Sequence, residues 1–231
     1  MTWRRYGLYW LPDPGTEPWA RRATDWLGWD AVAGAPCGLP EGLPPLPLPW
    51  AEITATPRRY GLHATLKPPF HLADGCTEDA LRDACARLAA GCAPVALPGL
   101  ALTPLGRFLA LTVPGDQSGL SRLAAACVRG VDEFRAPASE EELARRRMAG
   151  LSAEEDANLL RWGYPYVMER FRFHVTLTGR LSRAEVAEVT ARLQDWLMPL
   201  MPASLHIADI ALVGEDADGH LHLVERFALT G

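Results

Sequence analysis

Two short stretches of this chain share one pattern of histidine, a small or branched residue, threonine and leucine: His63–Leu66 and His174–Leu177, which begin 111 residues apart. Histidine titrates near neutral pH, so one imidazole can accept a proton while the other donates one. A threonine hydroxyl two residues further along can donate a hydrogen bond to an anionic oxygen. The doubled pattern therefore predicts acid–base chemistry on a phosphate ester. The candidate catalytic residues are His63, Thr65, His174 and Thr176.

Each pattern ends a run in which charged or small residues alternate with apolar ones, as expected for a strand that buries one face. By this alternation Arg59 and Lys67 share the face of His63, and Arg172 shares the face of His174. We expect these three cations to offset the negative charge of a bound phosphate. Lys67 is conspicuous because it is the only lysine beside 22 arginines, although a chance surface lysine is the alternative interpretation.

The elements that position these strands recur in the same order after each histidine, namely strand, helix, strand, strand. The expected strands lie at residues 4–11, 59–67, 95–102, 107–113, 170–178, 204–213 and 220–229, and the expected helices at 17–30, 77–90, 118–134, 138–161 and 182–197. This internal duplication predicts an α+β fold of two similar lobes in a single domain, 1–231, with antiparallel sheets lining a central cleft and helices outside. We expect the lobes at about 1–135 and 167–231, a helical connection at 136–166, and strand 4–11 as a candidate member of the second lobe.

Two tyrosines are further candidates for the cleft. The segment Arg4–Leu8 repeats the letters of Arg58–Leu62, so Tyr9 stands at the histidine position of that repeat. If the first strand lies beside a histidine strand, Tyr9 can present its hydroxyl to the cleft; the alternative is a coincidental repeat of common strand residues. Tyr164 or Tyr166 can stack on a base or cap a sugar, with packing between the lobes as the alternative. We include Tyr9 and Tyr166 with the candidate substrate-binding residues.

Composition restricts the class of protein. The 231 residues are 48% hydrophobic, which is enough for a sizeable core, and the net charge of −5 disfavours long nucleic acid as a partner. No apolar stretch reaches transmembrane length, so we expect no membrane association and a cytoplasmic location. The five cysteines, an odd number without a Cys-x-x-Cys pair, argue against disulfides and against a structural zinc site.

Two kinds of binding motif are weak or missing. His220 and His222 have the spacing of metal ligands, but no second group of ligands accompanies them in the sequence. We therefore interpret this pair as an exposed strand face and expect no metal site. No Gly-x-Gly-x-x-Gly or Walker-type loop occurs in the sequence, which argues against nucleotide binding through a glycine-rich cradle. No cofactor is expected.

The two motifs, set on strands of a duplicated α+β fold, resemble those of the two-histidine (2H) phosphoesterase superfamily, which includes bacterial RNA 2',5'-ligases and cyclic phosphodiesterases. The longer wordings RRYGLHATLKPPF and RFRFHVTLTG are similar to a subgroup linked to phosphonate metabolism and to carbon–phosphorus lyase operons. The resemblance covers nearly the whole chain, and both motifs are intact. It implies metal-independent phosphodiester chemistry, with one histidine as general base and the other as general acid.

The expected function is hydrolysis of a small cyclic phosphodiester, and the subgroup suggests phosphoribosyl 1,2-cyclic phosphate as the substrate. The acidic net charge favours such a small-molecule partner over RNA. One alternative is an RNA-end enzyme, either a 2',3'-cyclic phosphodiesterase or a 2',5'-ligase, whose oligonucleotide binding should weaken steeply with salt. Another is a non-catalytic phosphate-ligand protein of a phosphonate operon, which binds its ligand without turnover. The symmetric motif leaves open which histidine is the acid, and the sequence gives no oligomeric state.

Overall fold

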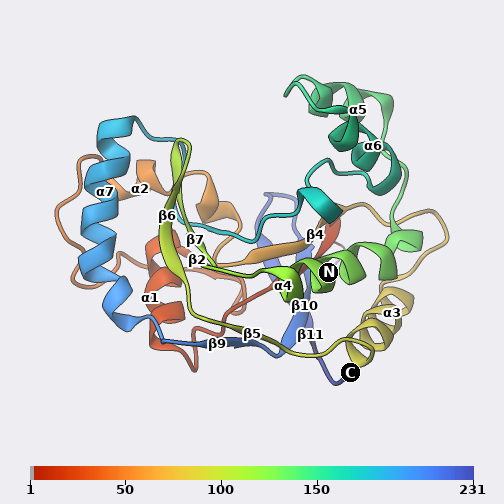
Figure 1. Ribbon diagram of the computed structural model, residues 1–231, viewed down its shortest axis with the longest axis horizontal. Helices are drawn as coiled ribbons and strands as arrows, with labels where there is room; N and C mark the ends of the chain where they lie inside the picture. Colours follow the sequence, from red (N-terminus) through yellow and green to blue (C-terminus); the bar gives the residue numbers. More distant parts are fainter. Residues whose placement is uncertain (1–2) are drawn as a thin grey trace.

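The computed structural model describes residues 3–231 and is built around one seven-stranded sheet (Figure 1). The strand order is β11-β10-β1-β4-β8-β7-β6, and every neighbouring pair is antiparallel. The strands of this sheet are β1 (Arg5–Trp10), β4 (Ala64–Phe70), β6 (Ala101–Leu105), β7 (Phe108–Thr112), β8 (Val175–Thr176), β10 (Asp209–Glu215) and β11 (Leu221–Ala228). Two short ribbons complete the strands: β2 (Trp29–Asp30) with β3 (Ala35–Pro36), and β5 (Val95–Leu97) with β9 (Leu205–Ile207). The α+β class and the antiparallel pairing predicted from the sequence are confirmed.

Helices cover one face of the sheet. The α-helices are α1 (Pro18–Leu27), α2 (Trp50–Ile53), α3 (Glu78–Ala90), α4 (Ser118–Gly130), α5 (Glu140–Arg147), α6 (Ala153–Trp162) and α7 (Arg183–Trp196), and the 3₁₀ turns are η1 (Pro57–Arg59), η2 (Asp132–Phe134), η3 (Met168–Arg170) and η4 (Met198–Leu200). Helix α7 packs against β6 and β7, α4 against β4, and α3 against β10 and β11. In Figure 1, α1 and α7 lie near one end of the sheet, and α3 and α4 near the other. Across residues 3–231, none of the helices combines the length and apolar character needed to cross a bilayer.

The two faces of the sheet differ in chemistry because successive side chains of a strand point to opposite sides. Leu8 and Val175 point into the main core, which also contains the buried side chains of the helices. The opposite face carries a smaller apolar cluster around Tyr9. Tyr9 pairs directly with Thr65 of β4, so Thr65 points to the same side. The first histidine motif is thus set on the face that is turned away from the main core.

The two halves of the chain are interlocked. Strands β6 and β7 follow the first histidine in sequence, yet they join the second histidine strand, β8. Strands β10 and β11 follow the second histidine, and they reach the first histidine strand, β4, through β1. The lobes expected at 1–135 and 167–231 therefore do not coincide with the two ends of the sheet. Consecutive strands usually pair with each other, which is why the sequence suggested a simpler division. Strand β1 does pair with a C-terminal strand, β10, as the sequence suggested.

The segment predicted as a helical connection, 136–166, contains α5 and α6. Helix α5 buries none of its side chains, and an ion pair of 2.6 Å between Arg147 and Asp156 joins the two helices. A capping box at Ser152 and Glu155 fixes the start of α6. In Figure 1 these helices form an arm that stands apart from the sheet. From α6 the chain continues through η3 to the second histidine motif.

Candidate active site

The two histidine motifs lie side by side at the centre of the sheet. Strands β4 and β8 pair antiparallel, with Ala64 opposite Val175. Continuing this register by one residue in each direction places each histidine opposite the threonine of the other motif. His63 and His174 then form a diagonal cross-strand pair, for which the typical separation is about 7–8 Å. The site therefore has local two-fold symmetry, with one imidazole and one hydroxyl from each motif.

Backbone carbonyls hold both imidazoles in the same way. Nδ1 of His63 lies 3.0 Å from the carbonyl oxygen of Gly61, and Nδ1 of His174 lies 2.8 Å from that of Arg172. A carbonyl oxygen can only accept a hydrogen bond, so Nδ1 must carry a proton and donate it. Nε2 is then the atom of each ring that can take up or release a proton. The two imidazoles are thus held in the same way, just as the two motifs share one sequence pattern.

Gly61 provides the carbonyl that orients His63, and only glycine suits its position. Its φ is +65°, and a Cβ there would lie 2.7 Å from the carbonyl oxygen of Trp29. We predict that Gly61→Ala lowers stability by about 1–3 kcal/mol, since backbone strain and a backbone contact add together, and that it displaces His63 and slows turnover. Thermal unfolding and hydrolysis rates measure the two effects.

Gly106→Ala is the matched control for this prediction. Gly106 has the same φ of +65° but open space around it, and it does not line the cavity beside His174, so the substitution introduces strain without a clash. Equal losses of activity in the two variants would contradict a specific role for Gly61 in orienting His63.

Aromatic rings surround His63, and burial lowers its pKa. The ring of Tyr9 lies edge-on to the imidazole at 5.0 Å between centroids, and that of Tyr60 at 6.1 Å. Burial lowers the pKa of His63 to about 4; the nearby His174 lowers it further, while the Gly61 carbonyl acts in the opposite direction. His63 is therefore neutral at physiological pH and suited to accept a proton.

Tyr9 packs against His63 and is almost completely buried. Its side chain is 2% exposed, and burial raises the pKa of its hydroxyl. The ring covers Gly7, where a Cβ would lie 2.9 Å from the tyrosine oxygen. Strand β1 does lie beside β4, as the sequence suggested. The interpretation of Tyr9 as a substrate-binding residue stays a prediction: most of its side chain packs in the smaller apolar cluster, and its ring contacts that of His63.

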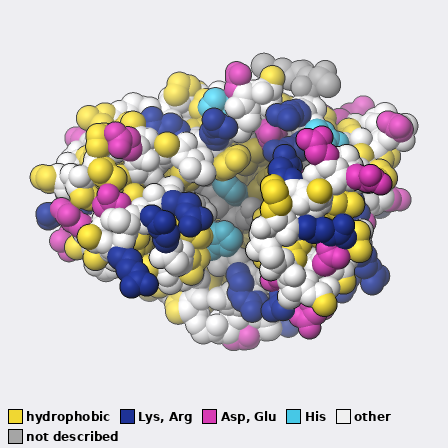
Figure 2. Space-filling view, turned by 90° about the horizontal axis from the view of Figure 1, so that it is seen from above, with side chains coloured by type: hydrophobic (Ala, Val, Ile, Leu, Met, Phe, Trp, Pro, Cys, Tyr) yellow, Lys and Arg dark blue, Asp and Glu magenta, His cyan; other side chains and the backbone are white. Residues whose placement is uncertain are grey.

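A cavity of about 480 Å³ lies beside His174. It brings together four residues expected from the sequence, namely Thr65, His174, Arg172 and Tyr166. Figure 2 shows a hollow in one face of the molecule, with histidine side chains in its floor and arginine side chains along its rims. A hollow with this lining attracts an anionic ligand.

The cavity also includes residues outside the sequence-based set. Phe108, Arg170 and Phe171 line it together with Tyr164, which the sequence offered as an alternative to Tyr166, and the ring of Phe108 lies 6.3 Å from that of His174. Arg170 carried a sequence signal, because it precedes its histidine by four residues as Arg59 does in the first motif. Phe108 carried no such signal, since only the pairing of β7 with β8 brings it to the motif.

Arg59 is one of two predicted phosphate ligands that do not line this cavity. It ends η1, and its side chain is exposed. The strand expected over 59–67 begins only at Ala64, because Gly61 takes the left-handed conformation and interrupts the extended chain. The strand expected over 170–178 is shorter too: η3 ends at Arg170, and only Val175–Thr176 form β8.

Lys67 is the second of these residues, and a β-bulge turns it away from the motif. The register between β1 and β4 shifts by one residue, so that Lys67 pairs with Leu8 on the helix-covered face. There its ammonium, only 2% exposed, donates to the Val128 carbonyl at 2.8 Å and to Asp132 at 3.0 Å. Burial lowers the pKa of Lys67, and Asp132 opposes that shift. The expectation that Lys67 contacts phosphate is therefore wrong.

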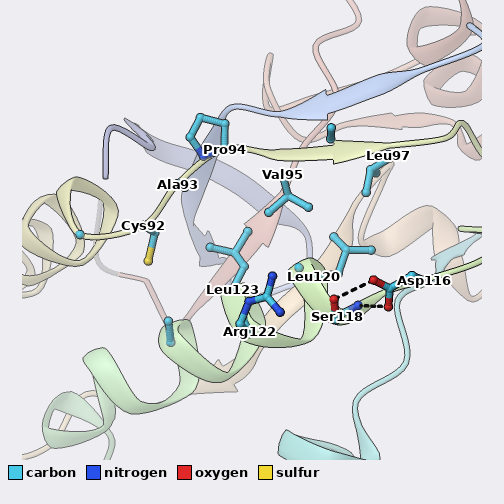
Figure 3. A pocket seen from close by; sticks show the side chains of 14 residues that line it. Cys92, Ala93, Pro94, Val95, Leu97, Asp116, Ser118, Leu120, Arg122 and Leu123 are labelled. Carbon is cyan, nitrogen blue, oxygen red and sulfur yellow. Dashed lines mark hydrogen bonds between the residues drawn. The ribbon is translucent and has the colours of Figure 1, made fainter.

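A second cavity, of about 530 Å³, lies between β5 and the start of α4 (Figure 3). Apolar side chains such as Val95 and Leu120 line it together with polar ones, and Arg122 is the cation among its lining residues. Asp116 accepts hydrogen bonds from the N–H and the hydroxyl of Ser118, at 2.9 and 2.8 Å. No imidazole lines this cavity, so we place the phosphoester chemistry in the cavity beside His174.

The β10–β11 hairpin carries a group of side chains that could hold a cation. Ligand atoms of Asp216, Asp218 and His220 lie within 4.8 Å of one another, and His222 Nε2 lies 2.8 Å from Asp216. The sequence suggested an exposed histidine pair without further ligands, whereas the turn places two carboxylates beside it. The group lies outside the cavity beside His174, and we assign it no part in the phosphoester chemistry.

Comparison with known proteins finds relatives among longer chains. The ribose 1,5-bisphosphate phosphokinase PhnN of Janthinobacterium sp. (strain Marseille) is 42% identical over 184 residues, which is 78% of this chain and 40% of that protein. The protein of the same name from Laribacter hongkongensis (strain HLHK9) is 38% identical over 194 residues, 81% of this chain and 43% of that protein. The chain thus spans about two fifths of the length of the curated relatives it matches.

Solved structures with some likeness of fold include one described as a phosphoesterase, with a TM-score of 0.45 and 12% identity over 100% of both chains. TT0787 of Thermus thermophilus gives a TM-score of 0.46 and 18% identity over 98% of both chains. E. coli LigT complexed with 3'-AMP gives 0.44 and 14%, also over 98% of both chains. The resemblance to 2H phosphoesterases continues to rest on the two motifs.

A family model described as "Protein of unknown function (DUF1045)" matches residues 65–222. The match runs from Thr65 of the first motif, through the whole second motif, to His222 on β11. It also includes Phe108 and Arg170 of the cavity beside His174. Since the match extends over well more than half of the residues, the chain belongs to the DUF1045 family.

Proposed function

We propose that this protein hydrolyses a small cyclic phosphodiester and that its substrate is phosphoribosyl 1,2-cyclic phosphate. The observation that carries the proposal is the pairing of two histidine motifs on neighbouring strands, each with Nδ1 held by a backbone carbonyl. Imidazoles held in this way can transfer protons on opposite sides of one phosphorus atom. The two proton transfers that hydrolysis requires are then both supplied by side chains, without a metal ion.

In this reaction His63 is the general base and His174 the general acid. Neutral His63 takes a proton from a water molecule whose oxygen attacks phosphorus. The bond between phosphorus and the ribose O2 breaks, and His174, as an imidazolium, donates its proton to that oxygen. Thr65 and Thr176 donate hydrogen bonds to the nonbridging oxygens, and Arg172 offsets their charge. The lowered pKa of His63 is the reason for this assignment.

The names of the relatives support the choice of substrate. Opening the 1,2-cyclic phosphate at the bond to O2 leaves the phosphate on O1 and gives ribose 1,5-bisphosphate. The curated relatives are named for a kinase that acts on ribose 1,5-bisphosphate, and this chain corresponds to about two fifths of their length. We do not propose kinase activity for this chain, because its sequence contains no Walker-type phosphate loop.

Hydrolysis followed by phosphorus NMR tests the proposal. In separate reactions with excess chelator, the purified protein receives phosphoribosyl 1,2-cyclic phosphate, nucleoside 2',3'-cyclic and 3',5'-cyclic phosphates, and ADP-ribose cyclic phosphate. We expect the first to be consumed with the highest kcat/KM and to yield ribose 1,5-bisphosphate. Failure to consume any of them would refute the phosphodiesterase, and activity that the chelator abolishes would support a metal mechanism instead.

The pH dependence of the reaction follows from the lowered pKa of His63. A general base must be deprotonated, so kcat/KM should fall only as the pH drops through about 4, and not near the ordinary histidine value of 6.5. Between these two values the unfolded chain binds more protons at this position, so stability should also fall as the pH drops through the same window. Rates and urea unfolding across the acidic range check both effects. An acidic limb centred near 6.5 would contradict His63 as the base.

A second candidate function is hydrolysis of a 2',3'-cyclic phosphate at an RNA end. The aromatic side chains of the cavity, Phe108, Tyr164, Tyr166 and Phe171, favour it because they can stack on a base. Binding of an RNA oligonucleotide would weaken steeply with salt, since each phosphate contact releases counterions. A flat salt response together with low activity on nucleoside 2',3'-cyclic phosphates would exclude this candidate.

A further inference from the structure

Two arginines line the cavity beside His174. The two proton transfers of the proposed reaction do not fully explain why either arginine lies there. Arg170 and Arg172 line the cavity together with aromatic rings. We propose that Arg170 binds a second phosphate group of the substrate, so that the protein selects cyclic phosphates that also carry a terminal phosphate. This inference rests on the proposed function. It names Arg170 as the side chain that binds the terminal phosphate of the same substrate.

A strained turn holds Arg170 at the cavity. Arg170 ends η3, and the first residue of that turn, Met168, has a φ of +55° although it is not glycine. Met168 is 8% exposed and packs with Val128 and Val167. Such a backbone conformation persists only where the surrounding packing imposes it, and strained positions of this kind gather at binding sites. The packing of Met168 therefore fixes the position of the backbone from which the Arg170 side chain extends.

Glu154, on the helical arm, forms an ion pair with the guanidinium of Arg170. Nη2 lies 3.0 Å from Oε2 of Glu154 and 3.2 Å from Oγ of Ser152, both at the start of α6. The Glu154 side chain is 75% exposed, so water screens this ion pair and the pair is weak. Nε of Arg170 is shielded from solvent and has no hydrogen-bond acceptor among residues 3–231. Glu154 therefore pairs with only some of the N–H donors of the guanidinium.

A phosphate group would satisfy the guanidinium more completely than Glu154 does. Its oxygens can accept from two N–H groups of the guanidinium at once, which is the paired geometry that guanidinium favours with phosphate. Arg172 donates from Nη1 to the carbonyls of Glu169 and Phe171, at 3.3 and 2.7 Å, which holds it close to the second motif. The cavity therefore offers one guanidinium for each of the two phosphate groups of phosphoribosyl 1,2-cyclic phosphate. The aromatic walls can pack against the sugar between them.

Binding of ribose 5-phosphate tests this subsite, because that probe carries the terminal phosphate without the cyclic diester. Calorimetry should show that Arg170→Gln weakens binding by roughly 10- to 100-fold, the loss expected for paired charge-assisted hydrogen bonds. Glu154→Gln should act in the opposite direction and tighten binding by about two- to five-fold, because it removes the competing carboxylate. Absence of binding by the wild type, or equal affinities in all three proteins, would overturn the proposal.

Two substitutions on α5 are matched controls for the change of charge. Arg145 and Glu141 are exposed and lie on the same arm, outside the cavity. Arg145→Gln and Glu141→Gln should leave the affinity for ribose 5-phosphate unchanged. If they shift it as much as the Arg170 and Glu154 variants do, the effect is one of net charge and the subsite is refuted.

Kinetics separate the subsite from the proposed function. We compare phosphoribosyl 1,2-cyclic phosphate with ribose 1,2-cyclic phosphate, which lacks the terminal phosphate. Arg170→Gln should raise KM for the first substrate with little change in kcat, and should leave the second substrate unaffected. If the wild type hydrolyses both with equal kcat/KM, the subsite is wrong and the proposed function stands. If it hydrolyses neither, the proposed function fails, and ribose 5-phosphate binding still decides the subsite.

Discussion

His63→Ala and His174→Ala should each lower kcat for the cyclic phosphodiester by roughly 10²- to 10⁴-fold, because each removes one of the two proton transfers. Both proteins should remain folded. Each ring is half-buried and makes one hydrogen bond to a nearby backbone carbonyl, so its loss leaves the main core intact. Steady-state kinetics and thermal unfolding on the same samples measure the two outcomes.

His206→Ala is the matched control, since His206 is an exposed histidine on β9 that does not line the cavity. It should keep the wild-type rate. An aryl phosphodiester distinguishes the two roles, because its phenolate leaves without being protonated. On that substrate His174→Ala should lose much less than His63→Ala. Equal losses would contradict the assignment of His63 as base and His174 as acid.

Asp132→Ala should destabilise the protein by about 3–5 kcal/mol, because it leaves the buried ammonium of Lys67 without its counter-charge. Lys67 is 2% exposed and lies 3.0 Å from Asp132, which also pairs with Arg135 at 2.9 Å. The Val128 carbonyl is then the remaining acceptor for Lys67 at this site. Urea unfolding of the variant measures the loss.

The Lys67→Met substitution tests the other member of the same ion pair. It replaces the ammonium by an apolar chain of similar length and leaves Asp132 paired with Arg135. Exchange of a buried ion pair for apolar packing is often neutral, so stability should stay within about 2 kcal/mol of the wild type. The rate should also be unchanged, since Lys67 points to the helix-covered face. A large loss of rate in a stable Lys67→Met protein would restore its role as a phosphate ligand.

Features of the fold that depend on neighbouring residues could be predicted from the sequence. The helices expected at 77–90 and 182–197 are Glu78–Ala90 and Arg183–Trp196, because a capping side chain and an apolar stripe are local signals. The shared face of Thr65 and His63 also follows from local alternation, since the two residues are only two positions apart. The same alternation failed for Lys67, because a β-bulge lies between it and His63.

Features that depend on distant pairing could not be predicted. The position of Phe108 beside His174 requires β7 to pair with β8, and no pattern in either segment specifies that partner. The burial of Tyr9 requires the apolar cluster that joins β1, β10 and β11 to Trp29. The left-handed conformation of Met168 in η3 accompanies its packing with Val128 of α4. Each of these arises from contacts between residues far apart in the chain.

Hydrolysis in ¹⁸O-labelled water tests most directly the claim that the two histidines act together on one phosphorus atom. With chelator present, the wild-type protein should convert phosphoribosyl 1,2-cyclic phosphate to ribose 1,5-bisphosphate that carries one ¹⁸O in the phosphate on C1, as seen by phosphorus NMR. A protein with both His63→Ala and His174→Ala should form no labelled product in the same time. Label on a ribose carbon, ribose 2,5-bisphosphate as the product, or an unchanged rate in the double variant would contradict the account.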